Sequence, residues 1–213
     1  MKILVTGFEP FGGERLNPSQ AAIDRLPARL GGLRIATQLL PAAYAPSLGL
    51  LRAAIAREDP DIVLCTGEAG SRIDLTPERV AINVQDARIR DNEGDQPIDV
   101  AVVPGGPAAY FTTLPIKAAV HAMREAGLPA SVSNSAGTFV CNHVFYGLMH
   151  YAAMRKARFR GGFMHLPYLP EQAANHPKAP SMALDCIVRG IEIVLTVSAE
   201  TGADLVAAEG ETA

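Results

Sequence analysis

Cys141 lies where a turn of small residues runs into a predicted helix. Residues 135–143 read Ser-Ala-Gly-Thr-Phe-Val-Cys-Asn-His. A thiol in the first turn of a helix is close to unpaired backbone N–H groups and to the positive end of the helix dipole. These groups favour the nucleophilic thiolate and can also bind an oxyanion that forms beside the sulfur. Cys141 is therefore a candidate nucleophile, although free cysteines are more often inert packing residues.

His165 is the best candidate for a general base. It ends an apolar segment, residues 162–165, that is predicted to be a buried strand and is followed by Leu166-Pro167. In open α/β sheets the carboxyl ends of strands face the ligand crevice, where a general base would lie. A structural histidine is the alternative interpretation. The other four histidines are expected on helix surfaces, in a polar loop or on a different helix face from the cysteine: His121, His150, His176 and His143.

A third group is needed to hold the imidazole in the right tautomer, and Glu78 is the candidate. It lies in a long interval, residues 68–115, that is rich in Asp, Asn, Gly and Pro. Excursions of this length tend to be functional. On spacing alone, an exposed acid beside Arg79 would be the preferred interpretation.

Other catalytic chemistries have weaker support in the sequence. Residues 133–137 approach a nucleophile elbow but lack its leading glycine, which leaves Ser135 as a minor alternative. Cys141 and His143 are two residues apart on a helix and face different ways, and no H-x-x-x-H or C-x-x-C occurs, so zinc is not expected. No Walker loop is present, and no G-x-G-x-x-G follows a strand. We therefore expect neither a metal nor a cofactor.

The elements that must position these side chains follow from the apolar periodicity. The sequence predicts strands at residues 3–6, 33–40, 61–66, 80–87, 130–134 and 162–166, and helices at residues 17–26, 47–57, 115–126, 139–158 and 181–198. This alternation implies an α/β fold, a three-layer α/β/α sandwich with a mostly parallel, twisted sheet. The segments that follow the strand ends should then meet at one edge of the sheet. They begin after Thr6, Thr66, Ser133 and Met164.

The composition fits one globular domain. The chain has 213 residues, a mass of 22.5 kDa, a formal net charge of −3 and a sequence pI of about 5.9. Its 48% apolar and 19% charged residues exclude a disordered chain, and the acidic pI argues against binding to nucleic acid. The apolar run after the initial Met-Lys is too short for a signal peptide or a membrane span, so a cytoplasmic protein is expected. We predict a single catalytic domain over residues 1–198 and an acidic tail over residues 199–213 that frays.

The three cysteines, Cys65, Cys141 and Cys186, are an odd number at wide spacing and do not resemble a disulfide framework. In a reducing cytosol they would remain thiols. Cys65 lies inside a predicted strand and is expected in the core. Cys186 lies on the last helix and is expected to be a packing or interface residue.

Four stretches of the chain resemble the pyroglutamyl peptidase I (pyrrolidone-carboxylate peptidase) family. They are residues 6–13 (Thr-Gly-Phe-Glu-Pro-Phe-Gly-Gly), 77–84 (Pro-Glu-Arg-Val-Ala-Ile-Asn-Val), 135–146 and 163–172. The resemblance implies a cysteine exopeptidase that removes an N-terminal pyroglutamyl residue from peptides through a thioester. It implies a catalytic triad that falls here on Cys141, His165 and Glu78. It also implies a cytosolic, metal-free enzyme with one α/β/α domain, often assembled as a homotetramer.

The chemistry of the substrate fits this resemblance. Pyroglutamate is a neutral lactam without a free amine, so its site needs an apolar slot with a few hydrogen bonds. The first loop carries Phe8 and Phe11 among glycines and can supply aromatic sides for that slot. The substrate-binding positions expected with the resemblance are Phe8, Phe11, Asn17, Glu68, Arg88 and Val140, and Arg88 is also expected to help hold an oxyanion.

Two positions depart from the family pattern. Glu68, in the Glu-Ala-Gly of residues 68–70, stands where the family more often has glutamine, at a position associated with the lactam. A carboxylate can accept from the lactam N–H but can donate to the ring carbonyl only when it is protonated. Glu68 therefore puts the usual ring contacts and the pH optimum into question. Arg90 replaces a common proline, and we expect only a local loop change there.

Two other functions would suit a similar sheet. A nucleoside phosphorylase would need phosphate and would leave Cys141 inert. A non-catalytic binder of small molecules would keep the pocket but lack a competent triad. Turnover of a chromogenic pyroglutamyl amide by the wild type and by Cys141→Ala separates these alternatives from a cysteine peptidase.

Overall fold

A six-stranded sheet forms the centre of the computed structural model, which describes residues 1–210. The strand order is β2-β3-β1-β4-β8-β5. The four inner strands, which are parallel, are β3 (Leu33–Leu40), β1 (Lys2–Phe8), β4 (Ile62–Glu68) and β8 (Arg160–Leu166). The two edge strands run antiparallel to their neighbours and are β2 (Arg29–Leu30) and β5 (Thr76–Pro77). The mostly parallel sheet predicted from the sequence is confirmed.

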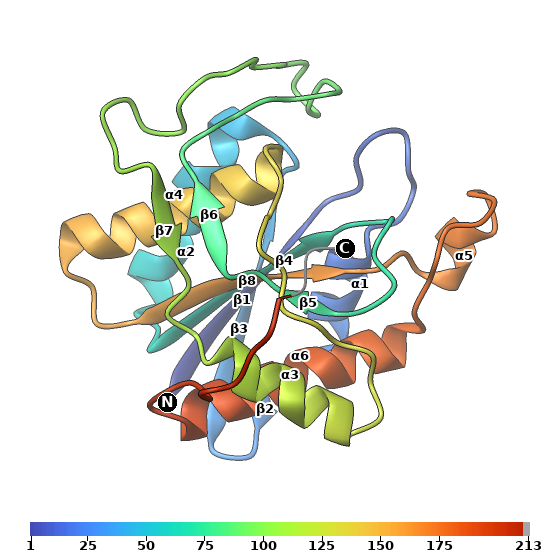
Figure 1. The fold of residues 1–213 in the computed structure, drawn as a ribbon. Coiled ribbons are helices and arrows are strands. Elements are labelled where there is room, and N and C mark those ends of the chain that lie inside the picture. The colour runs from blue at the N-terminus through green and yellow to red at the C-terminus, as the bar shows by residue number, and fades with distance from the viewer. Residues whose placement is uncertain (211–213) are drawn as a thin grey trace.

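Helices cover both faces of this sheet (Figure 1). On one face lie α1 (Pro18–Arg25), α3 (Ile116–Glu125) and α6 (Leu184–Glu200), and on the other lie α2 (Tyr44–Glu58) and α4 (Val140–Arg155). A short helix, α5 (Pro170–Ala173), follows β8. The three layers match the predicted α/β/α sandwich. None of the helices within residues 1–210 combines the length and apolar character that a membrane crossing requires.

Two apolar clusters, one on each face, hold the layers together. The central strands β1 and β4 are buried on both sides, as expected for parallel strands with near-continuous apolar runs. Ile3 and Val5 of β1 pack toward α1, α3 and α6, whereas Leu4 and Phe8 pack toward α2 and α4. This alternation is the two-residue period of a strand, and it assigns successive side chains of β1 to the two opposite faces of the sheet.

The strand predicted over residues 80–87 is shorter in the structure. Residues 80–82 form β6 (Val80–Ile82), which pairs with β7 (Ala109–Phe111) in a two-stranded antiparallel sheet that contacts α4 (Figure 1). Further along the predicted strand, Gln85 forms a single antiparallel bridge to Val100. Beyond β6 the side-chain amide of Asn142 takes the place of a neighbouring strand and donates to the carbonyl of Val84 at 2.9 Å. A side chain of α4 thus satisfies part of the backbone that follows β6.

The strand predicted over residues 130–134 is also wrong in extent. This segment forms isolated parallel bridges, one between Leu75 and Ala130 and one between Glu78 and Ser133. The bridges place Glu78 beside the segment that leads into α4, which matters for the site described below.

Residues 201–210 of the acidic tail lie against the domain. Asp204 accepts two backbone hydrogen bonds from the start of α3, at 2.9 and 3.2 Å, and Glu209 forms an ion pair with Arg124 at 2.6 Å. The acidic side chains thus satisfy a helix N-terminus and a cation on the domain, which the count of acidic residues did not anticipate. The last three residues of the predicted tail lie outside the described residues.

Candidate active site

A cavity of about 600 Å³ lies beyond the carboxyl ends of β1, β4 and β8. Segments far apart in the chain meet there, as the parallel topology predicts. Its lining includes Phe11, Glu68, Arg88, Thr138, Phe139, Cys141, His165, Tyr168 and His176. The cavity therefore brings the predicted nucleophile and the predicted base to one place.

Cys141 and His165 are neighbours because of strand register. The sulfur of Cys141 would lie only 2.8 Å from a Cβ built on Gly67, so it lies directly above this glycine of β4. Gly67 is the register partner of His165 on β8, and register partners on adjacent strands point to the same face of a sheet. The imidazole and the sulfur therefore occupy adjacent positions on the α4 side of the sheet.

Burial raises the pKa of the Cys141 thiol, and the charges of Glu68 and Glu78 raise it further, while the charge of Arg72 opposes them. Cys141 is the second residue of α4 and benefits from the helix terminus, but desolvation outweighs this effect. The helix start alone therefore does not provide the thiolate expected from the sequence. The resting thiol needs a base to take its proton.

His165 is held by Glu78. Its Nδ1 lies 2.7 Å from Oε1 of Glu78, and both side chains are buried. The backbone fixes the carboxylate, because the N–H of Glu78 donates to the carbonyl of Phe163 at 2.9 Å. The ring of Phe163 also packs on the imidazole, with ring centroids 4.9 Å apart. Since Nδ1 faces the carboxylate, Nε2 is the nitrogen that can exchange a proton with a group in the cavity.

Glu78 is fully buried, which contradicts the exposed-acid interpretation that spacing alone allowed. Its charge is balanced by Arg72, whose guanidinium lies 3.1 Å from the same Oε1 that meets His165. The guanidinium also donates to the carbonyl of Ser135 at 3.0 Å. Arg72 lies in the same polar interval as Glu78, but no spacing rule singled it out.

The start of α4 can receive negative charge. No side chain caps this helix terminus, and the turn before it passes through Gly137, whose φ of +73° is a left-handed conformation that favours glycine. Gly137 and Thr138 both line the cavity, as does Arg88. Backbone N–H groups at an uncapped helix start next to a sulfur form a suitable place for an oxyanion.

The apolar part of the cavity is aromatic. Phe11 and Phe139 have ring centroids 5.9 Å apart, and Ile89 lines the same space. Phe139 was missed as a pocket residue, although it stands two positions before the nucleophile. These rings offer an apolar surface against which a flat ring can pack.

Three of the expected substrate-binding side chains do not line the cavity. Phe8 and Val140 are buried in the core between the sheet and the α2–α4 layer. Asn17 is the N-cap of α1, where it accepts from the N–H of Ser19 at 2.9 Å and donates to the carbonyl of Glu9 at 3.0 Å. Its side chain supports the loop that carries the aromatic residues rather than facing the cavity.

Glu68 does line the cavity, at the end of β4. It is buried, and its Oε2 accepts from Nε2 of Gln172 at 2.7 Å. Burial raises the pKa of Glu68 to about 7, while the bond from Gln172 works in the opposite direction. Near neutral pH this carboxyl group is therefore divided between its neutral and charged forms.

Two further histidines lie in surroundings that the sequence did not predict. His176, expected in a polar loop, lines the cavity, pairs with Glu14 at 2.6 Å and stacks on Tyr168. His143 is buried next to Tyr44, and burial lowers its pKa to about 4. His143 is therefore neutral at physiological pH and is not among the residues that line the cavity.

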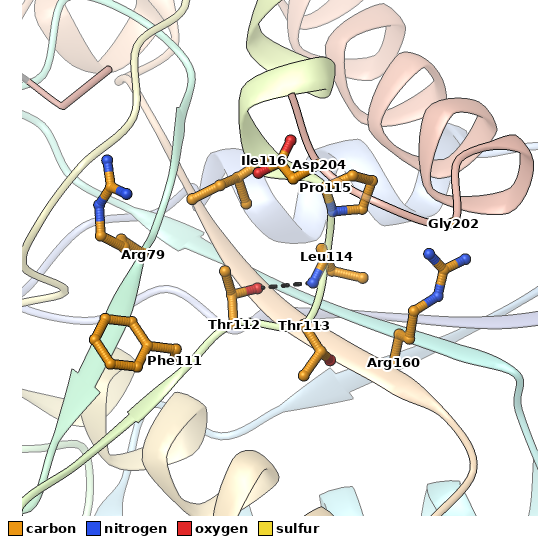
Figure 2. Close-up of a pocket in the computed structure, with 10 residues that line it drawn as sticks. All are labelled: Arg79, Phe111, Thr112, Thr113, Leu114, Pro115, Ile116, Arg160, Gly202 and Asp204. Carbon is orange, nitrogen blue, oxygen red and sulfur yellow. Dashed lines mark hydrogen bonds between the residues drawn. The ribbon is translucent and has the colours of Figure 1, made fainter. Parts of the chain in front are cut away.

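A second cavity of about 290 Å³ lies beside the tail. Figure 2 shows Arg79 and Arg160 on opposite sides of it, with Thr112 between them. The described residues that line it include no cysteine and no histidine, so they offer no thiol–imidazole pair. Within residues 1–210, no group of three or more His, Cys, Asp or Glu side chains is arranged to hold a metal ion.

Comparison with known proteins agrees with this geometry. A family model described as pyroglutamyl peptidase matches residues 1–201. The chain is 56% identical to the pyrrolidone-carboxylate peptidase of Escherichia fergusonii, over 99% of this chain and 98% of the relative, and 58% identical to that of Erwinia tasmaniensis, over 99% of each. The crystal structure of pyroglutamyl peptidase I from Bacillus amyloliquefaciens has a TM-score of 0.94 at 47% identity and covers 97% of this chain and 99% of that one. The chain therefore belongs to the pyroglutamyl peptidase family.

Proposed function

We propose that this protein is a cysteine exopeptidase that hydrolyses the bond after an N-terminal pyroglutamyl residue, with Cys141 as nucleophile, His165 as general acid–base and Glu78 as the orienting carboxylate. The observation that carries the assignment is that the sulfur of Cys141 and the imidazole of His165 lie next to each other on one face of the sheet. The sulfur lies above Gly67, the register partner of His165, and Nδ1 of His165 lies 2.7 Å from Glu78. Family membership supports the same reaction.

In the first half of the reaction, the Cys141 sulfur attacks the pyroglutamyl carbonyl carbon while Nε2 of His165 takes the thiol proton. The electron pair of the carbonyl moves to its oxygen, where N–H groups at the start of α4, together with Arg88, stabilise the negative charge. The tetrahedral intermediate then collapses and the C–N bond breaks. His165 gives its proton to the leaving amine, and a thioester remains on Cys141.

In the second half, His165 takes a proton from water as the water oxygen attacks the thioester carbonyl. Collapse of this second intermediate breaks the C–S bond and releases pyroglutamate. The proton returns from His165 to the sulfur, which restores the resting thiol. Glu78 keeps the imidazole oriented and stabilises its protonated form in both halves.

The pocket explains why a cyclised residue would be selected. Phe11, Phe139 and Ile89 provide an apolar surface for the ring, and Glu68 is placed to meet its polar edge. An uncyclised N-terminal residue would bring a charged ammonium into this apolar space, where burial without a suitable partner costs several kcal/mol. Neutral Glu68 cannot offset that cost as a carboxylate would, so we expect discrimination to be strongest at or below pH 7.

The assignment is tested with a chromogenic pyroglutamyl amide. We expect Cys141→Ala to lower kcat/KM by about a thousandfold or more, because a covalent step loses its nucleophile. Cys186→Ala is the matched control, since this thiol lies on α6 away from the cavity, and it should keep wild-type turnover. Unimpaired turnover by Cys141→Ala would remove the cysteine mechanism.

We further propose, from the family resemblance, that the protein assembles as a homotetramer and acts in the cytoplasm. The three cysteines are free thiols in the structure, which is consistent with a reducing compartment. Light scattering on the purified protein tests the assembly, and fractionation of cells that produce it tests the location. A monomer at micromolar concentration, or recovery outside the cytoplasmic fraction, would overturn the respective proposal.

A further inference from the structure

Arg72 is the cation that meets the buried carboxylate of the candidate triad. Its guanidinium lies 3.1 Å from Oε1 of Glu78, the same oxygen that lies 2.7 Å from Nδ1 of His165. The Glu78 side chain is completely buried, while that of Arg72 is only 25% exposed. A buried carboxylate needs a partner of opposite charge to stay ionised, and a neutral imidazole does not supply one.

The same guanidinium also reaches the turn that precedes the nucleophile. It donates to the carbonyl of Ser135 at 3.0 Å, and residues 135–139 lead directly into α4 and Cys141. Arg72 thus links the carboxylate on one side of the site to the backbone that sets the helix start on the other. Both contacts are made by Nη2, a terminal guanidinium nitrogen that has two hydrogens to donate.

The charge of Arg72 also acts on the sulfur. Burial, Glu68 and Glu78 all raise the pKa of Cys141, and Arg72 lowers it. Without Arg72, less positive charge would lie near the sulfur. The thiolate formed by proton transfer from Cys141 to His165 would then be less stable beside the two carboxylates.

We propose that Arg72 is a positioning residue of the reaction: it compensates the charge of the buried Glu78 side chain, keeps that side chain directed at His165, and ties it to the turn before Cys141. This proposal rests on the triad proposed above. Arg72 acts chiefly through Glu78, with no contact to the substrate required.

The first test is the pH profile of kcat/KM for Arg72→Gln and Arg72→Lys. Loss of a positive charge raises the pKa of neighbouring groups, so the ascending limb of Arg72→Gln should move to higher pH by about one unit or more. We expect its kcat/KM at pH 7 to fall about tenfold, and Arg72→Lys should keep the position of the limb while losing part of kcat. Loss of fold alone would lower the amplitude without moving the limb, and an unmoved limb in Arg72→Gln would overturn the proposal.

Arg79→Gln is the matched control. Arg79 directly follows Glu78 in the chain, but its guanidinium binds the side chain of Asn134 and the carbonyl of Glu209. Its removal should leave the pH limb in place. A shift as large as that of Arg72→Gln would show that any nearby charge suffices and would also overturn the proposal.

A double-mutant cycle separates this inference from the triad itself. If Arg72 acts through Glu78, the kcat/KM of the double variant with Glu78→Gln should lie within about threefold of Glu78→Gln alone. Fully multiplicative losses would overturn the role of Arg72 while leaving the triad intact. A fully active Glu78→Gln would instead overturn the triad, and the role of Arg72 with it.

Discussion

Replacing Glu68 with glutamine removes a titrating group from the cavity with almost no change in its size. The bond from Gln172, 2.7 Å in the structure, can be kept, because the introduced amide also offers an oxygen acceptor. What changes is the charge. Burial raises the pKa of Glu68 from 4.5 to about 7, so the wild-type side chain becomes negative just above neutral pH and the glutamine does not.

The effect on stability follows from the direction of this shift. A carboxyl group whose pKa is higher in the folded than in the unfolded state makes the folded protein lose stability as pH rises from 4.5 to 7. With about 1.4 kcal/mol for each unit, the full effect is on the order of 3 kcal/mol above pH 7. Glu68→Gln should therefore have a larger free energy of unfolding than the wild type at pH 8, with the difference disappearing near pH 4.

The effect on activity follows from the same group. Above pH 7 the charged carboxylate can no longer donate to a ring carbonyl, and it opposes negative charge on Cys141. If only the neutral form is productive, the ratio of kcat/KM for Glu68→Gln over the wild type should rise about tenfold between pH 6 and pH 8.

Steady-state kinetics with a pyroglutamyl amide and urea unfolding, both from pH 5 to pH 9, measure these two effects on the same samples. Glu125→Gln is a suitable control, because this exposed carboxylate near the end of α3 is not among the residues that line the cavity. A ratio of kcat/KM that stays flat with pH, or a stability difference that does not grow above pH 5, would refute the reasoning about Glu68.

Three further perturbations have defined outcomes. Gly67→Ala would place a Cβ 2.8 Å from the sulfur of Cys141 and 2.9 Å from Cζ of Phe163, so kcat should fall at least tenfold while calorimetry shows a folded protein. A wild-type kcat would contradict the proposed position of the sulfur. Asp204→Ala removes the two hydrogen bonds to the start of α3, so urea titration should show a free energy of unfolding lower by about 1 kcal/mol, with kcat unchanged. An unchanged free energy of unfolding would mean that the tail contact does not stabilise the fold. Burial lowers the pKa of His143 to about 4, so this side chain stabilises the folded state above pH 6.5 and loses that contribution as pH falls toward 4. His143→Phe should therefore flatten the dependence of the free energy of unfolding on pH between 6.5 and 4, and an unchanged dependence would argue against a buried neutral imidazole.

The sequence was most informative where periodicity and topology act together. Buried apolar runs predicted the parallel strands β1, β4 and β8, and parallel strands bring their carboxyl ends to one edge. That rule placed His165 at this edge, whereas the segment before Cys141 was expected to follow a strand over residues 130–134 that forms only isolated bridges. The role proposed for Glu78 needed the resemblance to a family, because spacing alone favoured an exposed acid.

The direction of individual side chains and the polar contacts between distant segments could not be predicted from the sequence. Phe8 and Phe11 are three residues apart in one motif, yet strand alternation buries Phe8 in the core while Phe11 faces the cavity. Arg72 has no periodic signal, and its role depends on a carboxylate six residues later that folds back beside it. The acidic tail looked solvated because composition does not reveal that Asp204 meets a helix start.

The formation of a thioester on Cys141 can be measured directly by acid-quenching the enzyme during turnover of a pyroglutamyl ester and mapping the modified peptide by mass spectrometry. The proposed mechanism predicts one pyroglutamyl group on the peptide that contains Cys141, and its absence in Cys141→Ala. A pyroglutamyl group found on Ser135 instead, or rapid turnover by the wild type with no modified cysteine at any quench time, would contradict it.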